Sequence, residues 1–204
     1  MVIAIINYGM GNLRSVQKGL ESVGCQAFIT SDPREIQRAK GIVLPGVGAF
    51  ADAIESLKEN GLIPVIHEAI RAGKPFLGIC LGMQLLFEYS EENGLHQGLS
   101  IFKGGVKRLS SGLKVPHMGW NQLKFKRESP ILKDVPEGTA CYFVHSYHVI
   151  PDEQEVVIAT TEYGQEVVAM VARENVFGIQ FHPEKSSKWG LRILKNYGEL
   201  VSTC

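Results

Sequence analysis

The first half of the chain alternates short apolar runs with stretches of helical periodicity. Apolar runs bounded by Gly, Pro, Asn or Asp indicate buried strands, predicted at residues 2–8, 26–30, 41–44 and 76–79. Apolar residues at helical spacing predict helices at residues 12–23, 33–40, 49–59 and 62–72, the first with Asn12 as its N-cap. Because strands that alternate with helices need crossover connections, this half predicts a mainly parallel sheet flanked by helices.

The second half of the chain has a different pattern. Residues 103–170 are rich in Val, Thr, Tyr and Gly, which is typical of strands, and turn signals occur at residues 111–112, 136–138 and 162–164. A closing helix is predicted over residues 191–201. There is no internal repeat, low-complexity tract or linker. The predicted fold is therefore one α/β domain over residues 1–204, an open, mostly parallel sheet with an antiparallel β-rich second half.

The composition of the chain argues against several functional classes. The 204 residues are 45% hydrophobic and 21% charged, with a formal net charge of zero, which favours neither a nucleic-acid surface nor a membrane surface. The N-terminus has no basic, signal-like region, so a cytoplasmic location is expected. The cysteines at 25, 80, 141 and 204 form no Cys-x-x-Cys pair, which argues against a zinc site or a disulfide framework. No metal site is predicted.

Cys80 lies where an apolar run meets a Gly-x-Cys-x-Gly turn and a helical pattern follows. A strand that turns sharply into a helix through two glycines is typical of a nucleophile elbow, with Cys here in place of Ser. Side chains at Gly78 and Gly82 would collide with the turn and the neighbouring backbone. The helix N-terminus would favour a thiolate. A buried structural cysteine is the alternative, but the spacing favours a nucleophile.

The segment 176–184 supplies a base for that nucleophile. It has the pattern of a buried strand that ends in His182, Pro183 and Glu184. In an extended segment alternate residues project from the same side, so His182 and Glu184 are expected to be neighbours, with Pro183 keeping the chain extended. Glu184 would orient the ring while its other nitrogen faces the thiol. Any strand can end in polar residues, so the prediction depends on the combination with Cys80.

The loop Pro45-Gly-Val-Gly48 follows the third predicted strand. Attack on an acyl carbon places negative charge on oxygen, which backbone N–H groups can stabilise. Gly46, Val47 and Gly48, with the N–H of Leu81 after the nucleophile, are the candidates for such an oxyanion hole. Taken by itself, the loop fits an ordinary strand-exit turn better.

These motifs together resemble the class I, triad-type glutamine amidotransferases, which hydrolyse the side-chain amide of glutamine. Four further segments resemble the branch of this family that serves imidazole glycerol phosphate synthesis, in the histidine pathway. They are residues 7–12, 45–50, 116–121 and 142–147, of which Pro-His-Met-Gly-Trp-Asn at 116–121 is the most discriminating. The resemblance extends over essentially the whole chain.

The resemblance implies roles for individual residues. Cys80 would attack the amide carbon, while His182 would protonate the departing ammonia and then activate water. Gln84 would hydrogen-bond the substrate amide, and Ser146 and Tyr147 would hold its α-amino and α-carboxylate groups. The resemblance also implies that the oxyanion strand is wrongly oriented until a partner binds, so that the peptide at Val47 has to flip. No cofactor is expected.

A partner is also implied by the resemblance. Asn12 and Trp120 would meet a separate (β/α)8-barrel synthase subunit, which uses the ammonia to form imidazole glycerol phosphate and AICAR from N′-phosphoribulosyl-formimino-AICAR phosphate. Trp120 can equally be read as a core residue of a β-rich segment. The pair Gly9 and Gly11 suggests a dinucleotide-binding turn, but Arg14 stands where its third glycine would be, and we discard that interpretation.

Three other functions remain open at this point. A class I glutaminase could serve pyridoxal phosphate, anthranilate or aminodeoxychorismate synthesis instead. A thiol hydrolase of another kind, such as a peptidase, would also use a cysteine and a histidine. A relative without activity would act only as a binding module.

Overall fold

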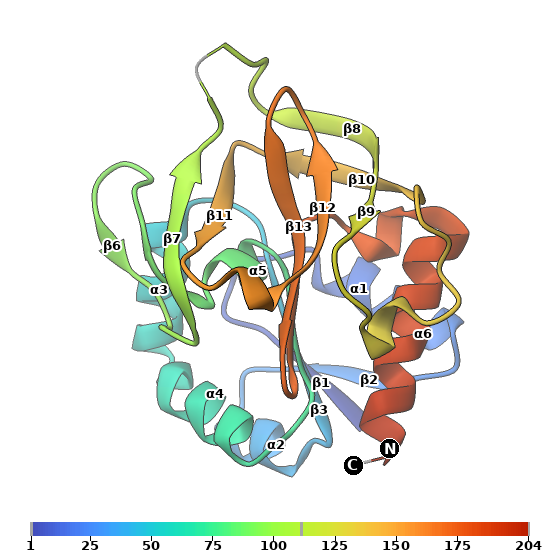
Figure 1. Ribbon diagram of the computed structural model, residues 1–204. Helices are drawn as coiled ribbons and strands as arrows, with labels where there is room; N and C mark the ends of the chain where they lie inside the picture. Colours follow the sequence, from blue (N-terminus) through green and yellow to red (C-terminus); the bar gives the residue numbers. More distant parts are fainter. Residues whose placement is uncertain (1, 111, 204) are drawn as a thin grey trace.

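The computed structural model describes residues 2–110 and 112–203, and its largest sheet has eight strands in the order β2-β1-β3-β4-β14-β13-β12-β9 (Figure 1). The predicted turn at residues 111–112 falls partly on Ser111, and Cys204 is the last residue. Both lie outside the described residues. The mostly parallel α/β architecture predicted from the sequence is confirmed.

The parallel half of this sheet consists of β1 (Val2–Ile6), β2 (Gln26–Thr30), β3 (Gly41–Gly46), β4 (Phe76–Cys80) and β14 (Val176–Ile179). Side chains of β1 alternate between two apolar clusters, with Ile3 and Ile5 in one cluster and Ala4 and Ile6 in the other. Such alternation is expected when helices cover both faces of a sheet, because successive residues of a strand project to opposite sides.

Two sets of helices cover this sheet (Figure 1). The helices α1 (Leu13–Ser22) and α6 (Ser187–Thr203) pack into one apolar cluster. The helices α2 (Pro33–Arg38), α3 (Phe50–Glu59) and α4 (Leu62–Arg71) pack into the other. Asn12 occupies the N-cap position of α1, but its side chain makes no capping hydrogen bond. The helix begins where the sequence predicts, without the predicted cap interaction.

The second half of the chain extends the sheet and adds two smaller ones. Antiparallel strands β13 (Glu166–Arg173), β12 (Val157–Glu162) and β9 (Lys124–Phe125) continue the large sheet beyond β14. The strands β8 (His117–Gln122) and β10 (Ala140–His145) form a separate antiparallel pair. The third sheet has the order β11 (Tyr147–Pro151), β7 (Phe102–Arg108), β5 (Phe87–Ser90) and β6 (His96–Gln97). The sequence does not predict β5 or β6, and β5 pairs with β7 in parallel.

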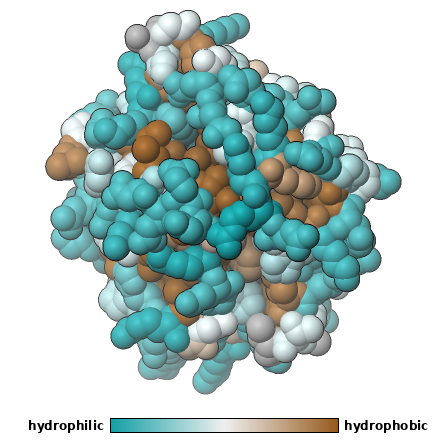
Figure 2. Space-filling model, viewed as in Figure 1, coloured by the Kyte–Doolittle hydropathy of each residue, from teal (hydrophilic) through white to brown (hydrophobic). Residues whose placement is uncertain are grey.

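Short helical turns connect these strands at α5 (Leu81–Gln84), η1 (Pro130–Leu132), η2 (Gln154–Val156) and η3 (Pro183–Lys185). Polar side chains cover most of the face seen in Figure 2, with apolar groups between them. The exposed large apolar side chains of the molecule include Met118 and Trp120 of β8. Within the two described ranges, no helix combines the length and the apolar character needed to cross a membrane.

Candidate active site

Cys80 stands at the sharp turn between β4 and α5. Its backbone has φ 56° and ψ −113°, a strained conformation for a residue with a side chain. A Cβ at Gly82 would lie 1.8 Å from the carbonyl oxygen of Leu44, and one at Gly78 would lie 2.6 Å from the oxygen of Gly82. The predicted collision with neighbouring backbone is therefore confirmed, and the turn has the geometry of a nucleophile elbow.

The helix after Cys80 is shorter than the sequence suggests. The segment α5 contains only the four residues Leu81–Gln84, after which the chain enters β5. A macrodipole needs several aligned turns, so the expectation of a helix dipole that favours the thiolate finds little support in this geometry.

His182 reaches Cys80 because β14 lies next to β4. The two strands are parallel and in register, with Ile179 opposite Ile79. Three residues beyond Ile179, the His182 N–H donates to the carbonyl oxygen of Tyr142 in β10 at 3.0 Å. This hydrogen bond ties the backbone of His182 to the small sheet that contains β10.

Glu184 pairs with His182 as predicted, but through a different backbone conformation. The His182 Nδ1 to Glu184 Oε1 distance is 2.9 Å, and both side chains are almost completely buried. Pro183 begins the 3-10 turn η3, so the predicted extended exit is wrong. Proline is favoured at the first position of a helical turn, because its missing N–H is not needed there. The turn, and not strand alternation, brings the carboxylate to the ring.

The electrostatic environment of His182 favours a charged ring. Burial lowers the pKa of His182, but the nearby Cys80 and the hydrogen-bonded Glu184 outweigh burial and raise the pKa from 6.5 to about 9. The Nε2 atom is buried and has no partner within hydrogen-bonding distance among the described residues. Catalytic contacts of this kind are often long before substrate binds. The free nitrogen is available for the proton of the thiol.

A cavity of about 360 Å³ opens beside Cys80. It brings together most of the residues that the sequence singles out. Its lining consists of Val47, Gly48, Cys80, Leu81, Gln84, Glu92, Pro116, Val144, His145, Ser146, Tyr147 and His182. The volume is in the range of small-molecule sites, and apolar walls with a few polar groups are typical of such sites.

Gly46 does not line this cavity. A Cβ at Gly46 would lie 2.6 Å from Tyr8 Oη and 2.9 Å from Leu81 Cβ, so this glycine allows β3 to pack directly against the elbow. The next residue, Val47, is 43% exposed, and Gly48 has φ +102°. The loop therefore leaves the sheet at the cavity and has the conformational freedom that glycine supplies.

Gln84 is held by two acceptors. Its Nε2 donates to the Tyr147 carbonyl oxygen at 2.9 Å and to Gln180 Oε1 at 3.0 Å, which uses both of its hydrogens. Gln180 Nε2 in turn lies 3.8 Å from the sulfur of Cys80. The Gln84 side chain can therefore offer a ligand only its oxygen, as an acceptor.

Glu92 is a site residue that the sequence does not reveal. It lines the cavity, and its Oε2 accepts the N–H of Phe50, the first residue of α3, at 2.8 Å. In the sequence, Glu92 belongs to a polar Glu-Glu-Asn-Gly stretch that reads as an exposed turn. Only the tertiary fold places this carboxylate in the lining of the cavity beside Cys80.

Asn12 and Trp120 lie outside the cavity. Trp120 is 56% exposed on β8, and its ring stands edge-on to Tyr142 with centroids 6.1 Å apart. The alternative of a core tryptophan is therefore wrong. Asn12 is half-buried at the start of α1. Neither residue contributes to the lining around Cys80.

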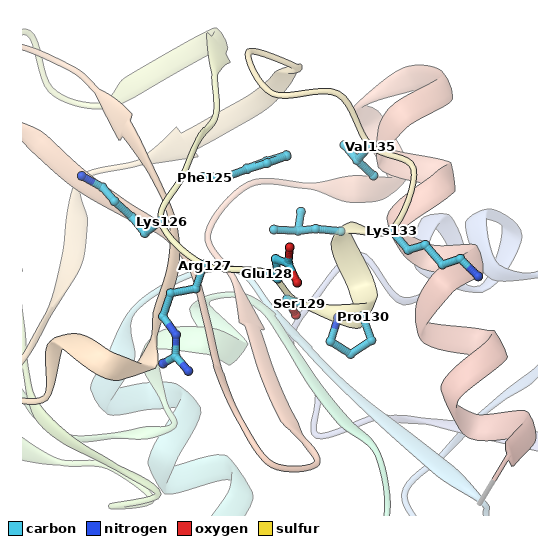
Figure 3. Close-up of a pocket in the computed structure, with 9 residues that line it drawn as sticks. Phe125, Lys126, Arg127, Glu128, Ser129, Pro130, Lys133 and Val135 are labelled. Atoms are coloured by element: carbon cyan, nitrogen blue, oxygen red, sulfur yellow. The ribbon is translucent and has the colours of Figure 1, made fainter.

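A wider cavity of about 710 Å³ lies elsewhere, lined by residues of the segment 125–135 (Figure 3). Its lining combines apolar residues such as Phe125, Pro130 and Val135 with the charged residues Lys126, Arg127, Glu128 and Lys133. None of the residues around Cys80 contributes to it. In the described part of the chain, no group of three or more His, Cys, Asp or Glu side chains could hold a metal ion.

The family model for glutamine amidotransferase class-I matches residues 4–198 of this sequence. The chain belongs to this family. In this amidotransferase Cys80 and His182 line one cavity, and Glu184 contacts the His182 ring.

Two curated relatives share more than half of their aligned residues with this chain. This amidotransferase is 57% identical over 199 residues to the imidazole glycerol phosphate synthase subunit HisH of Moorella thermoacetica, covering 98% of this chain and 95% of the relative. It is 55% identical to the subunit of the same name from Caldanaerobacter subterraneus, covering 98% of both chains.

Solved structures agree on the fold. A glutamine amidotransferase superposes with a TM-score of 0.78 at 18% identity, over 99% of this chain and all of the other. PurLQS from Thermotoga maritima gives a TM-score of 0.73 at 19% identity, over 99% of this chain and 97% of that one. At such identities the likeness concerns the fold alone.

Proposed function

We propose that this chain hydrolyses L-glutamine to glutamate and ammonia with Cys80, His182 and Glu184. The observation that carries the proposal is the buried series from Glu184 through His182 to Cys80 at one small cavity. In this proposal residues 1–204 form one glutaminase domain that acts in the cytoplasm and needs no cofactor.

The reaction proceeds through a thioester. The Cys80 sulfur attacks the amide carbon, and its proton passes to His182 Nε2. The tetrahedral intermediate collapses as His182 returns the proton to the leaving nitrogen, which departs as ammonia. Water then attacks the thioester carbon while His182 takes a proton from it, and glutamate leaves as the sulfur recovers that proton. Glu184 stabilises the imidazolium at both stages.

The oxygen of the tetrahedral intermediate needs N–H donors. Leu81, directly after the nucleophile, supplies one, and the loop Gly46–Val47–Gly48 supplies the second. The position of Val47 and Gly48 at the cavity supports this assignment. Because glycine flanks Val47 on both sides, its peptide can flip with little steric cost, and partner binding would control that flip.

Substrate recognition follows from the polar groups around the cavity. Glutamine has an α-ammonium group that needs an acceptor, and Glu92 supplies the carboxylate at the cavity. The Gln84 oxygen accepts an N–H of the side-chain amide, because both N–H groups of Gln84 already bind protein atoms. Ser146 and Tyr147, which also line the cavity, hold the α-carboxylate and α-amino groups.

The ammonia is proposed to pass to a separate (β/α)8-barrel synthase subunit. Two relatives above 50% identity are named as subunits of imidazole glycerol phosphate synthase, which supports this partner and the use of ammonia in histidine biosynthesis. Trp120 and Asn12 would contact that subunit. An exposed tryptophan beside the exposed Met118 is the kind of anchor that protein interfaces use.

The test is release of glutamate from glutamine by the purified chain, alone and with the synthase subunit plus its ribonucleotide. We expect little activity alone and a large rise in the complex, and none in either condition for Cys80→Ala. Strong activity that the partner leaves unchanged would keep the chemistry but assign another pathway. No hydrolysis in the complex would contradict the glutaminase function and favour a binding module.

A further inference from the structure

Two buried histidines, His117 at the start of β8 and His145 at the end of β10, have no part in the mechanism above. His117 and His145 are 2% and 6% exposed, and His117 Nδ1 lies 2.9 Å from His145 Nε2. The ring of His117 is stacked between Tyr163 and Phe143, at centroid distances of 4.0 and 4.8 Å. His117 belongs to the segment 116–121, which also contains the predicted partner residue Trp120, but the His117 side chain is buried.

The proton positions on both rings follow from their other partners. His145 Nδ1 lies 2.9 Å from the carbonyl oxygen of Tyr147, which can only accept, so Nδ1 carries the hydrogen. In the neutral ring Nε2 then has a lone pair and accepts from His117 Nδ1–H. The remaining nitrogen of His117, Nε2, must be an acceptor.

Asn121 supplies the matching donor at the other end. Its Nδ2 lies 3.2 Å from His117 Nε2 and donates to the Glu162 carbonyl oxygen at 2.8 Å. Its Oδ1 accepts the N–H of Gln122 at 2.8 Å, so the amide cannot be reversed without losing both contacts. Both ends of the chain of hydrogen bonds therefore require the same tautomers.

The chain of hydrogen bonds ends in the substrate cavity. The Tyr147 oxygen that accepts from His145 also accepts from Gln84, whose second hydrogen goes to Gln180 beside the Cys80 sulfur. Although the His145 ring lines the cavity, both of its nitrogens are already engaged in this series of hydrogen bonds. Hydrogen bonds in such series polarise one another, so each member helps to fix the next.

Burial keeps both rings neutral. It lowers the pKa of His117 from 6.5 to about 4. The pKa of His145 falls to about 3, mainly through burial and further through the nearby rings of His117, His148 and His182, against the raising effect of the Tyr147 carbonyl. A second proton on either ring would bring two hydrogen-bond donors face to face. The hydrogen-bond geometry and the burial therefore both favour neutral rings.

We propose that Asn121, His117 and His145 are positioning residues, a neutral hydrogen-bond relay of fixed direction that holds the Tyr147 carbonyl and, through it, Gln84 for glutamine binding. The relay rests on the proposed glutaminase function for its catalytic consequence. It also links β8, which carries the exposed Trp120, to the wall of the cavity. None of the three residues needs to touch the substrate.

Two variants test the relay. Asn121→Asp keeps the shape of the side chain but sets an acceptor against His117 Nε2, which reverses or charges that ring. His117→Phe keeps the aromatic stack and removes both nitrogens. His148→Phe is the matched control, because His148 is equally buried but its Nε2 faces Gln165, outside the relay. If His117→Phe fails to fold, Asn121→Asp carries the test.

In the complex we expect KM for glutamine to rise about fivefold to tenfold in both variants. This is the change in binding that the loss of one neutral hydrogen bond would cause. The turnover number and the alkylation rate of Cys80 should change less, and His148→Phe should leave KM unchanged. A purely structural role would instead lower the amount of folded enzyme without changing KM. Equal KM changes in the control and the relay variants would overturn the proposal.

Nitrogen NMR tests the relay without any turnover, so its failure can be told apart from failure of the glutaminase function. Both rings should show hydrogen on Nδ1, and the side-chain amide resonance of Gln84 should move in Asn121→Asp and His117→Phe only. Hydrogen on Nε2 of either ring, or an unmoved Gln84 resonance, would refute the relay even in an active enzyme. These NMR results in a chain that does not hydrolyse glutamine would leave the relay standing and remove only its catalytic role.

Discussion

Cys80→Ala is expected to lower the pKa of His182 strongly. Burial alone would hold this pKa below 6.5, yet the nearby Cys80 and the hydrogen-bonded Glu184 raise it to about 9. The difference between 6.5 and about 9 corresponds to about 3 kcal/mol of added stability for the imidazolium in the folded state. Removing the sulfur removes the first of these two stabilising partners and leaves the carboxylate.

The same coupling predicts how stability depends on pH. A group whose pKa is raised by folding stabilises the folded state fully below its unfolded pKa and loses that contribution as pH rises through the folded value. For His182 the window runs from about pH 6.5 to about pH 9. In Cys80→Ala the loss should be smaller and should be complete at a lower pH, because the substitution lowers the folded-state pKa and leaves the unfolded one unchanged.

The assay is an NMR titration of the His182 ring. It is combined with the free energy of unfolding in urea, measured at about pH 6 and about pH 10, on either side of this window. Cys25→Ala is the control, because Cys25 packs against Gly198 of α6, outside the Cys80 cavity. A His182 ring that titrates near 6.5 in the unsubstituted protein would refute the reasoning. So would a pKa that Cys80→Ala leaves unchanged.

Three further predictions concern the turn, the triad and the partner surface. Gly82→Ala sets a Cβ 1.8 Å from a backbone oxygen and should lower the free energy of unfolding in urea by about 3 kcal/mol or more. Gly112→Ala is the control and should change this free energy little, because the space around Gly112 is open. His182→Ala should lose turnover on the order of 100-fold or more, and Glu184→Gln less; the reverse order would exchange the two roles. Trp120→Ala should weaken binding to the synthase subunit in a titration, and an unchanged Kd with unchanged stimulation would remove it from the interface.

The parts of the site that the sequence predicts are those fixed by local sterics. The spacing of Gly78, Cys80 and Gly82 is sufficient because a tight strand-to-helix turn excludes side chains whatever surrounds it. The neighbouring strands are predictable for a similar reason. Their apolar runs are continuous, since both faces of a parallel sheet are covered.

The parts that the sequence misses depend on tertiary contacts. Glu92 becomes a site residue only when β5 carries it to the start of α3. His117 reads as part of a surface motif, but strand alternation in β8 turns it inward while Trp120 remains exposed. The sequence correctly predicts Glu184 as the partner of His182 but wrongly predicts an extended backbone between them. Proline fits both an extended strand exit and the first position of a helical turn, so Pro183 does not distinguish the two.

The neighbouring positions of β4 and β14 set the order in which this enzyme can become active during synthesis. The two strands are adjacent in the sheet, yet nearly the whole β-rich half of the chain lies between them in sequence. Contacts between such distant segments form late in folding, because a long loop must close first. We expect a chain released before β14 to carry Cys80 without its base, and therefore to react slowly with a thiol-directed probe until the last strand is inserted. On this expectation, Cys80 and His182 come together only when nearly the whole chain has been made.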